Sequence, residues 1–365
     1  MNDKLKNLIL KTKQAEGSKF VYDEEKIISE SELQSKNSIS IAMLGFTMFG
    51  ALLSSLAFFG FLMLFEFNSS YYTLLILGLI LIAGSIYMST IVHELVYESF
   101  IISAYLSGII LVGYSLFGLD LNDNLVSIAM LAIAIVTIIF SPSYMVLLLA
   151  VLSIHTSLIS LINWNLQDYY GEINYIYTIL LAWFITFLLM KESFIIARYN
   201  KLSKIYDPVR LGSIAVFLVI FFLNTLSFSN FDFEKNSILQ ALTSIMIIGC
   251  ILVFIFYRLS RVLGLNDNER ILALVLTFVL LIPTLFYPAI SGSFLIIFLC
   301  FYVNYNSGLV AGLVGLVYFL FQYYYNLSFT LIEKSGILLV SGLLCLGIYS
   351  VIIKRFPKDF KNEAQ

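Results

Sequence analysis

Long apolar runs separated by short polar connections dominate the chain. Twelve of these runs approach the ~20 residues that an α-helix needs to cross the hydrocarbon core of a bilayer. They lie at 39–65, 71–91, 98–118, 125–140, 143–162, 174–190, 209–228, 237–257, 270–287, 289–305, 308–325 and 335–353. The pattern predicts an all-α, polytopic membrane domain over residues 39–353, with about twelve transmembrane helices, or about ten if one apolar pair is re-entrant.

Polar segments flank this domain at both ends. Residues 1–38 contain seven lysines and seven acids, and residues 354–365 form a short basic tail. The apolar strip within 4–13 fits an amphipathic helix on an anionic leaflet and equally a solvated arm. The segment 29–32 has the pattern of a capping box. We expect an N-terminal arm that is partly helical, followed by the membrane domain.

Basic residues predict the orientation of the helices. Nineteen of the 21 Lys and Arg residues fall in the N-terminal arm, the connections 191–210 and 258–270, and the tail. With twelve crossings these segments share one side, which the positive-inside rule assigns to the cytoplasm, together with both termini. The connection 191–210 also mixes apolar with basic residues, which predicts an interfacial helix ended by Asp207–Pro208.

Composition excludes several classes of protein. The chain has 365 residues, of which 60% are hydrophobic and 12% charged, and its mean hydropathy is +0.94. A soluble fold has too few charges here to cover so much apolar surface. The net charge of −2 also provides no basic field for nucleic acid. Soluble enzymes, nucleic-acid binders and disordered scaffolds are therefore excluded, and the lipid bilayer is the expected environment.

Ionisable side chains are almost absent from the predicted span centres. Acids and bases fall in connections or at span edges, and His155 in the fifth run is the exception. Buried ionisable groups in lipid usually mark ion paths or proton relays, so a carboxylate relay is disfavoured. His155 fits either a neutral, hydrogen-bonded packing residue or a functional polar group.

No cofactor or metal site is predicted. Cys250, Cys300 and Cys345 each lie inside an apolar run without a CxxC spacing, which favours small buried side chains. His93 and Glu94 lack the HExxH pattern, because residue 97 is a tyrosine.

Two similar stretches suggest an internal repeat. Asp- and Asn-rich segments at 118–124 and 264–268 each precede an apolar run, a proline and a second apolar run. Their offset of five spans would give the two units opposite orientations, as in transporters with inverted repeats. A chance likeness between helix caps is the other explanation. If the repeat is real, it predicts a polar midplane site at Ser141, Pro142, Ser143, Pro283, Ser291, Gly292 and Ser293, in addition to His155.

The last connection has an unusual composition. It contains three adjacent tyrosines, with Thr330, Lys334 and Ser335 downstream; the tyrosines are Tyr323, Tyr324 and Tyr325. An aromatic belt with a snorkelling lysine explains these residues, and so does a surface for a periplasmic partner. The stretch YYYxLxxTLxxKS resembles the C-terminal signature of a bacterial domain-of-unknown-function family of polytopic inner-membrane proteins. The resemblance is clearest from Ile271 onward, and it implies neighbouring small envelope proteins with a GDYxxLxY motif but no activity.

Three functions are consistent with these features. The first is a non-enzymatic envelope component in the bacterial inner membrane that works with a partner protein. The second is a transporter of a neutral or weakly polar small solute. The third, a membrane enzyme acting on lipid-linked substrates, is the least favoured, because the far side has only Lys235 and Lys334 to bind a diphosphate. No catalytic residue is predicted.

Overall fold

The computed structural model describes residues 41–64, 70–91, 95–165, 170–198, 203–227, 233–256, 267–285 and 287–326, with isolated positions between 332 and 350. Within them every regular element is a helix. The N-terminal arm with its apolar strip and capping-box pattern, the basic tail and most of the twelfth predicted run lie outside these residues.

The helices follow one another through short turns. Their bounds are α3 (Ile41–Leu64), α4 (Tyr71–Ile91), α5 (Leu95–Gly118), α6 (Asp123–Phe140), α7 (Tyr144–Asn165), α8 (Tyr170–Met190), α9 (Glu192–Arg198), α10 (Ser203–Ser227), α11 (Phe233–Phe254), α13 (Asp267–Leu281), the 3₁₀ turn η5 (Ile282–Thr284), α14 (Pro288–Val303) and α15 (Asn306–Asn326). Each predicted run up to residue 325 overlaps one of these helices, although α10 begins before its run 209–228 and the run 270–287 is divided between α13 and η5.

The helix lengths confirm an all-α membrane protein. Among the described residues, eight helices are long and apolar enough to cross a bilayer, and α11, α13 and α14 contain shorter apolar segments. A helix satisfies its own backbone hydrogen bonds, which is why an apolar run of this length becomes helical in lipid. Large side chains such as Phe46, Phe100 and Val314 are exposed, as expected for a surface that contacts lipid.

The region 191–210 differs from its prediction. It contains the short helix α9, and α10 then begins at Ser203 and continues through Pro208. Pro208 is the sixth residue of α10, where it removes one backbone hydrogen bond close to the helix start while the apolar run beyond it continues. The prediction that Asp207–Pro208 ends a helix is therefore wrong. Arg210, expected in the connection, lies inside α10.

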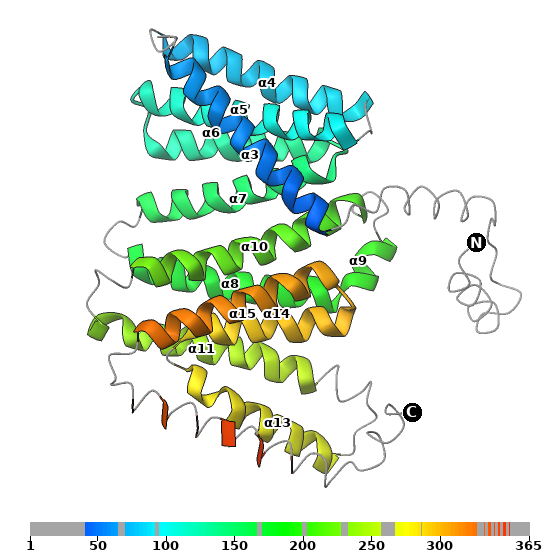
Figure 1. Cartoon of the computed structure of the whole chain (residues 1–365), viewed down its shortest axis with the longest axis vertical. Helices are drawn as coiled ribbons and strands as arrows, with labels where there is room; N and C mark the ends of the chain where they lie inside the picture. Colours follow the sequence, from blue (N-terminus) through cyan, green and yellow to red (C-terminus); the bar gives the residue numbers. More distant parts are fainter. Residues whose placement is uncertain are drawn as a thin grey trace, which may run out of the picture.

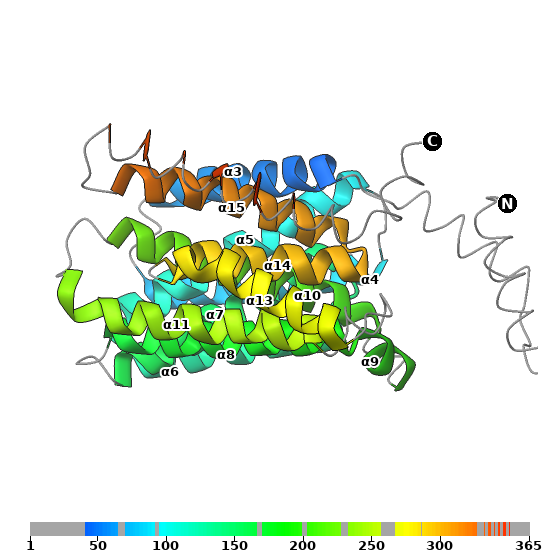
Figure 2. The same ribbon diagram turned by 90° about the horizontal axis from the view of Figure 1, so that it is seen from below.

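The long helices lie side by side in a flattened stack. Figure 1 shows α3 to α6 at one end, α11 and α13 at the other, and α7, α8 and α10 between them. Seen from below, α3 and α15 lie on one side of the stack and α6, α8 and α11 on the other (Figure 2). The main packed pairs include α4–α5, α6–α7, α7–α10 and α14–α15, so α7 and α10 join the two ends of the stack.

The largest core lies between α8, α10, α11, α14 and α15. Phe217, Phe221, Phe254 and Phe319 are fully buried there, and Phe217 and Phe221 meet edge to face with ring centres 4.9 Å apart. Cys250 and Cys300 are free and buried in the same cluster, which confirms their predicted role as small core residues; Cys345 lies outside the described residues. This core packs against α10 and holds that helix in position. The same helix forms one wall of the site described next.

Candidate functional site

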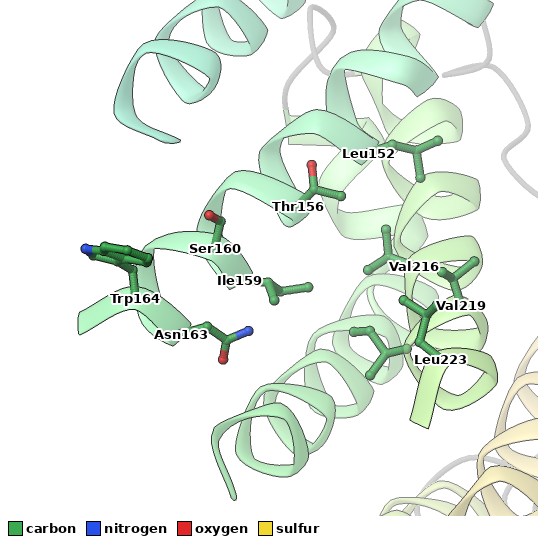
Figure 3. A pocket seen from close by; sticks show the side chains of 10 residues that line it. Leu152, Thr156, Ile159, Ser160, Asn163, Trp164, Val216, Val219 and Leu223 are labelled. Carbon is green, nitrogen blue, oxygen red and sulfur yellow. The ribbon is translucent and has the colours of Figure 1, made fainter. Parts of the chain in front are cut away.

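A groove runs between α7 and α10. Its volume is about 710 Å³, within the range of small-molecule sites. The lining residues are Leu152, Thr156, Ile159, Ser160, Asn163 and Trp164 from α7, and Val216, Val219, Ile220 and Leu223 from α10 (Figure 3). The α7 wall is partly polar, whereas the α10 wall is entirely aliphatic.

The groove opens on the surface of the helix stack. Thr156, Ser160, Trp164 and Val219 are exposed along its rim, while Val216 is buried at its base. Figure 3 shows Trp164 and Asn163 near one end of α7 and Leu152 toward the other end of the groove. The rim residues belong to helices that are long enough to cross a bilayer. The groove therefore opens toward the surrounding lipid.

Asn163 has an unused hydrogen-bonding atom at this site. Its side chain is 8% exposed. Its Nδ2 donates to Asn174 Oδ1 on α8 at 3.4 Å, but its Oδ1 is buried without a hydrogen-bond partner. A buried polar atom without a partner is unfavourable. The Asn163 amide is therefore only half hydrogen-bonded, and its oxygen is buried beneath the surface of the groove.

His155 links α7 to both α8 and α10. A hydrogen bond of 2.6 Å joins its Nδ1 to the Tyr177 hydroxyl on α8, and one of 3.3 Å joins its Nε2 to Ser213 Oγ on α10. His155 lies between the lining residues Leu152 and Thr156 in sequence but does not line the groove itself. These contacts support the interpretation of His155 as a neutral, hydrogen-bonded packing residue.

The polar wall is also attached to α6. Ser127 Oγ donates to Ser160 Oγ at 2.8 Å. The amides of Asn124 and Asn165 donate to each other at 3.0 and 3.2 Å. These contacts fix the end of α7 that carries Asn163 and Trp164.

A second polar cluster surrounds Arg210. Its side chain is 8% exposed and donates to Glu192 at 3.0 Å and to Asp207 at 2.6 Å. The guanidinium also lies 3.6 Å from the ring centre of Tyr305 and 5.2 Å from that of Tyr206. A buried arginine is costly in a membrane protein unless it is paired. This cluster pairs both terminal nitrogens of Arg210, leaves its Nε buried without a hydrogen-bond partner, and joins α9 and α10 to the α14–α15 turn.

The backbone of the α14–α15 turn positions Tyr305. Asn304 ends α14 in the left-handed conformation with φ of 58°, and the Tyr305 N–H donates to the Cys300 carbonyl at 2.8 Å. Burial raises the pKa of the Tyr305 phenol. The ring therefore stays neutral and presents its π face to the guanidinium.

The structure separates the predicted midplane residues. Ser141, Pro142 and Ser143 form the α6–α7 turn, where Ser141 Oγ lies 3.2 Å from Ser89 Oγ and Ser143 Oγ donates to Glu98 at 3.5 Å. Their neighbours are α4 and α5, and none of these residues lines the groove.

The other predicted midplane residues lie in η5 and α14. Pro283 is within η5, and Ser291 and Ser293 are fully buried and donate to carbonyls of their own helix. A Cβ on Gly292 would come within 2.6 Å of Phe221, so this glycine permits close packing on α10. The internal repeat stays a prediction.

The three adjacent tyrosines lie near the end of α15, and the connection after them is only partly described. The Tyr287 and Tyr323 rings are 5.3 Å apart, those of Tyr324 and Tyr325 are 6.1 Å apart, and Tyr325 is 72% exposed. Ser335 Oγ donates to the Ile332 carbonyl at 2.8 Å. Thr330 and Lys334 lie outside the described residues.

Sequence reasoning missed both the groove and the arginine cluster. Thr156, Ser160 and Asn163 follow an i, i+4, i+7 spacing that places polar groups on one face of α7, and this signal was available in the sequence. Arg210 was hidden because α10 begins earlier than predicted. Within the part of the chain that the structure describes, no group of three His, Cys, Asp or Glu side chains is arranged to hold a metal ion.

Comparison with known protein families gives a match over most of the chain. Residues 42–355 match a family described as a domain of unknown function, DUF4401. No curated protein and no solved structure matches the chain. The match covers nearly all of the predicted membrane domain. It agrees with the expected kind of family, while the signature around the tyrosines and the neighbouring envelope proteins stay predictions.

Proposed function

The chain belongs to the DUF4401 family, which brings no activity with it, and we propose that it binds a neutral, weakly polar small molecule in the α7–α10 groove and carries it across the membrane. The groove of about 710 Å³, with an uncharged, partly polar α7 wall and an aliphatic α10 wall, is the observation that carries the proposal. It favours the transporter hypothesis over an enzyme, for which no nucleophile–base pair was found in the sequence.

The chemistry of the walls supports a neutral ligand. All ten lining residues that the structure describes are uncharged, and a charged ligand would lose its hydration there without gaining a counter-charge. Ser160 and Thr156 add hydroxyl groups on the same wall as Asn163, and the aliphatic α10 wall suits an apolar body.

Binding is tested with Trp164 as the reporter. A Trp183→Phe variant leaves Trp164 as the single tryptophan, and 1-hexanol serves as a short neutral probe. We expect a saturable change in Trp164 emission. Thr156→Phe should abolish it by filling the groove, whereas Thr90→Phe, the same change at an exposed position on α4 outside the groove, should keep it. An unchanged emission in all variants would contradict binding.

Movement across the membrane is tested in proteoliposomes. Light scattering follows the entry of uncharged polyols and amides after an osmotic step. We expect at least one class of solute to enter faster with the unmodified protein than with Thr156→Phe. Equal entry rates for every solute in the series would contradict transport.

The proposal includes a location and an orientation. We place the chain in the bacterial inner membrane with both termini in the cytoplasm. The distribution of basic residues supports this topology. The groove end at Asn163 and Trp164 then faces the periplasmic side, because α7 is the fifth predicted crossing.

A second candidate function is supported by the exposure of Tyr325. In this alternative the chain is a non-enzymatic envelope component, and the end of α15 binds a small periplasmic protein. Aromatic side chains are frequent anchors at interfaces. Photocrosslinking from position 325 in cells tests it: a specific adduct that is absent when the photoreactive group is at position 314, on the exposed face of the same helix, would favour it.

A further inference from the structure

Two groups of helices make up the stack. The first contains α3 to α7, in which α4 packs on α5 and α6 packs on α7; the second contains α8, α10, α11, α14 and α15, which share the largest core. The two groups meet mainly where α7 packs against α10 (Figure 1). A movement of one group relative to the other would therefore act first on the α7–α10 pair, which also forms the groove.

The α7–α10 pair is closed over one half of its length. A Cβ on Gly212 of α10 would lie 2.8 Å from Cγ1 of Val151, so the two backbones approach closely there. Residues 145–148 of α7 are buried on this half. From Leu152 onward the groove separates the two helices, and Val219 is exposed on its rim. The pair is thus packed at one end and open at the other, which we call the groove end.

The Arg210 cluster lies at the packed end of the pair, the Arg210 end. It connects α10 to α9 through Glu192 and to the α14–α15 turn through Tyr305. Tyr144, the first residue of α7, lies beside Asp207 and Tyr305 in the same cluster. The cluster therefore ties the two groups of helices together at this end.

The contacts of this cluster can be exchanged for water. The side chains of Glu192 and Asp207 are 28% and 56% exposed, which places their carboxylates at the aqueous edge of the helices rather than in lipid. Arg210 Nε is buried without a partner, so the network is incompletely satisfied as it stands. The apolar core around Phe217 and Phe221 cannot open in the same way without exposing aromatic side chains.

The attachments at the groove end are different. There α7 is attached to α6 through Ser127 and Ser160, while its contact with α8, from Asn163 to Asn174, is 3.4 Å long. Phe221 holds the facing part of α10 in the largest core. The two walls of the groove therefore belong to different groups of helices, and the hydrogen bond that links the groups near Asn163 is a weak one.

We propose that the two groups of helices tilt relative to each other about the Gly212–Val151 contact, and that the Arg210 cluster is the latch that keeps the Arg210 end closed while the groove end is open. Release of the latch opens the Arg210 end and narrows the groove. The hydrogen bond from His155 to Ser213 lies next to the pivot, where such a movement displaces the helices least. This inference rests on the proposed function and supplies its mechanism of access from the two sides of the membrane, a rigid-body movement of packed bundles.

Distances between spin labels at the two ends test the proposal in phosphatidylcholine vesicles. In a cysteine-free background, one label pair spans the Arg210 end, at Thr90→Cys and Lys191→Cys, and a second pair spans the groove end, at Trp164→Cys and Leu223→Cys. All four positions are exposed, and each pair has one label on each group of helices.

Two isosteric substitutions release the latch. The double variant Glu192→Gln/Asp207→Asn keeps the shapes of both side chains and removes the charges that bind Arg210. The matched control is Asp267→Asn, which removes an ion pair with Arg270 on α13, outside the α7–α10 pair.

The expected result is a reciprocal change of the two distances. The double variant should raise the population of long distances at the Arg210 end about tenfold, because it loses two charge-assisted hydrogen bonds. The population of short distances across the groove should rise to the same extent, and Asp267→Asn should leave both unchanged. Thermal unfolding shows whether the double variant is folded; if it is not, Glu192→Gln alone is measured and should give the same reciprocal change with a smaller amplitude.

Other outcomes overturn the proposal in distinguishable ways. Unchanged distances in a folded latch variant would show that the Arg210 cluster is a fixed part of the fold. Longer distances at both ends would show loosened packing instead of a tilt about Gly212. If hexanol binds in the Trp164 assay and the distances do not change, this inference fails and the proposed function stands. If hexanol does not bind and the distances change reciprocally, the proposed function fails and the tilting movement stands.

Discussion

The guanidinium of Arg210 lies 3.6 Å from the centre of the Tyr305 ring, across the interface between α10 and the α14–α15 turn. Glu192 and Asp207 occupy the two terminal nitrogens of the same guanidinium. The Tyr305 ring therefore stacks on a guanidinium whose two terminal nitrogens are already paired with carboxylates. The contact joins two elements almost one hundred residues apart in sequence.

Removal of this ring should destabilise the protein. We expect Tyr305→Leu to lower the free energy of unfolding by ~1–2 kcal/mol, since a desolvated cation–π contact contributes about 2 kcal/mol. Tyr305→Phe keeps the π face and should lose much less. Denaturant unfolding in mixed micelles measures both variants; equal losses would assign the effect to the hydroxyl rather than to the ring.

The hydrogen bond between His155 and Tyr177 should contribute measurably. Tyr177→Phe removes the hydroxyl and is expected to cost ~0.5–2 kcal/mol, the range found for hydrogen bonds between membrane helices. Ser213→Ala removes the longer contact on the other ring nitrogen and should cost less. A double-mutant cycle of His155→Ala and Tyr177→Phe tests the pairing, and a coupling energy of zero would contradict it.

Close packing between α4 and α5 depends on two glycines. A Cβ on Gly108 would come within 2.8 Å of the Gly78 carbonyl oxygen and 2.6 Å of Ile82. Gly108→Ala should therefore destabilise the fold by ~1–3 kcal/mol through overpacking. A Cβ on Gly113, in the same helix, would meet no other atom within 4 Å, so Gly113→Ala is the matched control and should be neutral or stabilising by up to ~1 kcal/mol. Thermal unfolding distinguishes the two.

The proposed orientation predicts which residues are accessible from each side. In a background with Cys250, Cys300 and Cys345 replaced by alanine, Asn122→Cys should react with a membrane-impermeant thiol reagent from outside intact cells. Asp267→Cys should react only after the membrane is opened. Both positions are exposed at the start of a helix. The reverse pattern would invert the topology, and labelling of both from outside would change the number of crossings between them.

Sequence patterns predicted the helices well for a physical reason. An apolar run of about 20 residues has one favourable structure in lipid, and α4 begins and ends at the predicted residues. The beginning of α10 was less predictable, because the polar first turns before Pro208 lack the apolar signal and proline usually marks a boundary. For that reason Arg210 was predicted in a connection, whereas it lies within α10.

The groove was harder to predict than the helices. The polar spacing of Thr156, Ser160 and Asn163 identifies a face of α7, but sequence alone does not show that α10 lies opposite. These two helices are separated in the chain by α8 and α9. The predicted midplane residues failed to meet one another for the same reason: Ser141 packs near α4, whereas Gly292 packs on α10. Lateral contacts between helices depend on the complementary shapes of distant segments.

Under the proposed function, the unequal walls of the groove divide its selectivity between two helices. An aliphatic wall discriminates weakly, by about 1–3 kcal/mol for each methylene, whereas a buried hydrogen-bonding group rejects molecules that fail to pair with it far more strongly. Substitutions of Val219 or Ile220 on α10 should therefore change how tightly a set of related molecules binds. Substitutions of Thr156 or Ser160 on α7 should change which molecules belong to that set, so that chemical identity is read by one helix and shape is tolerated by the other.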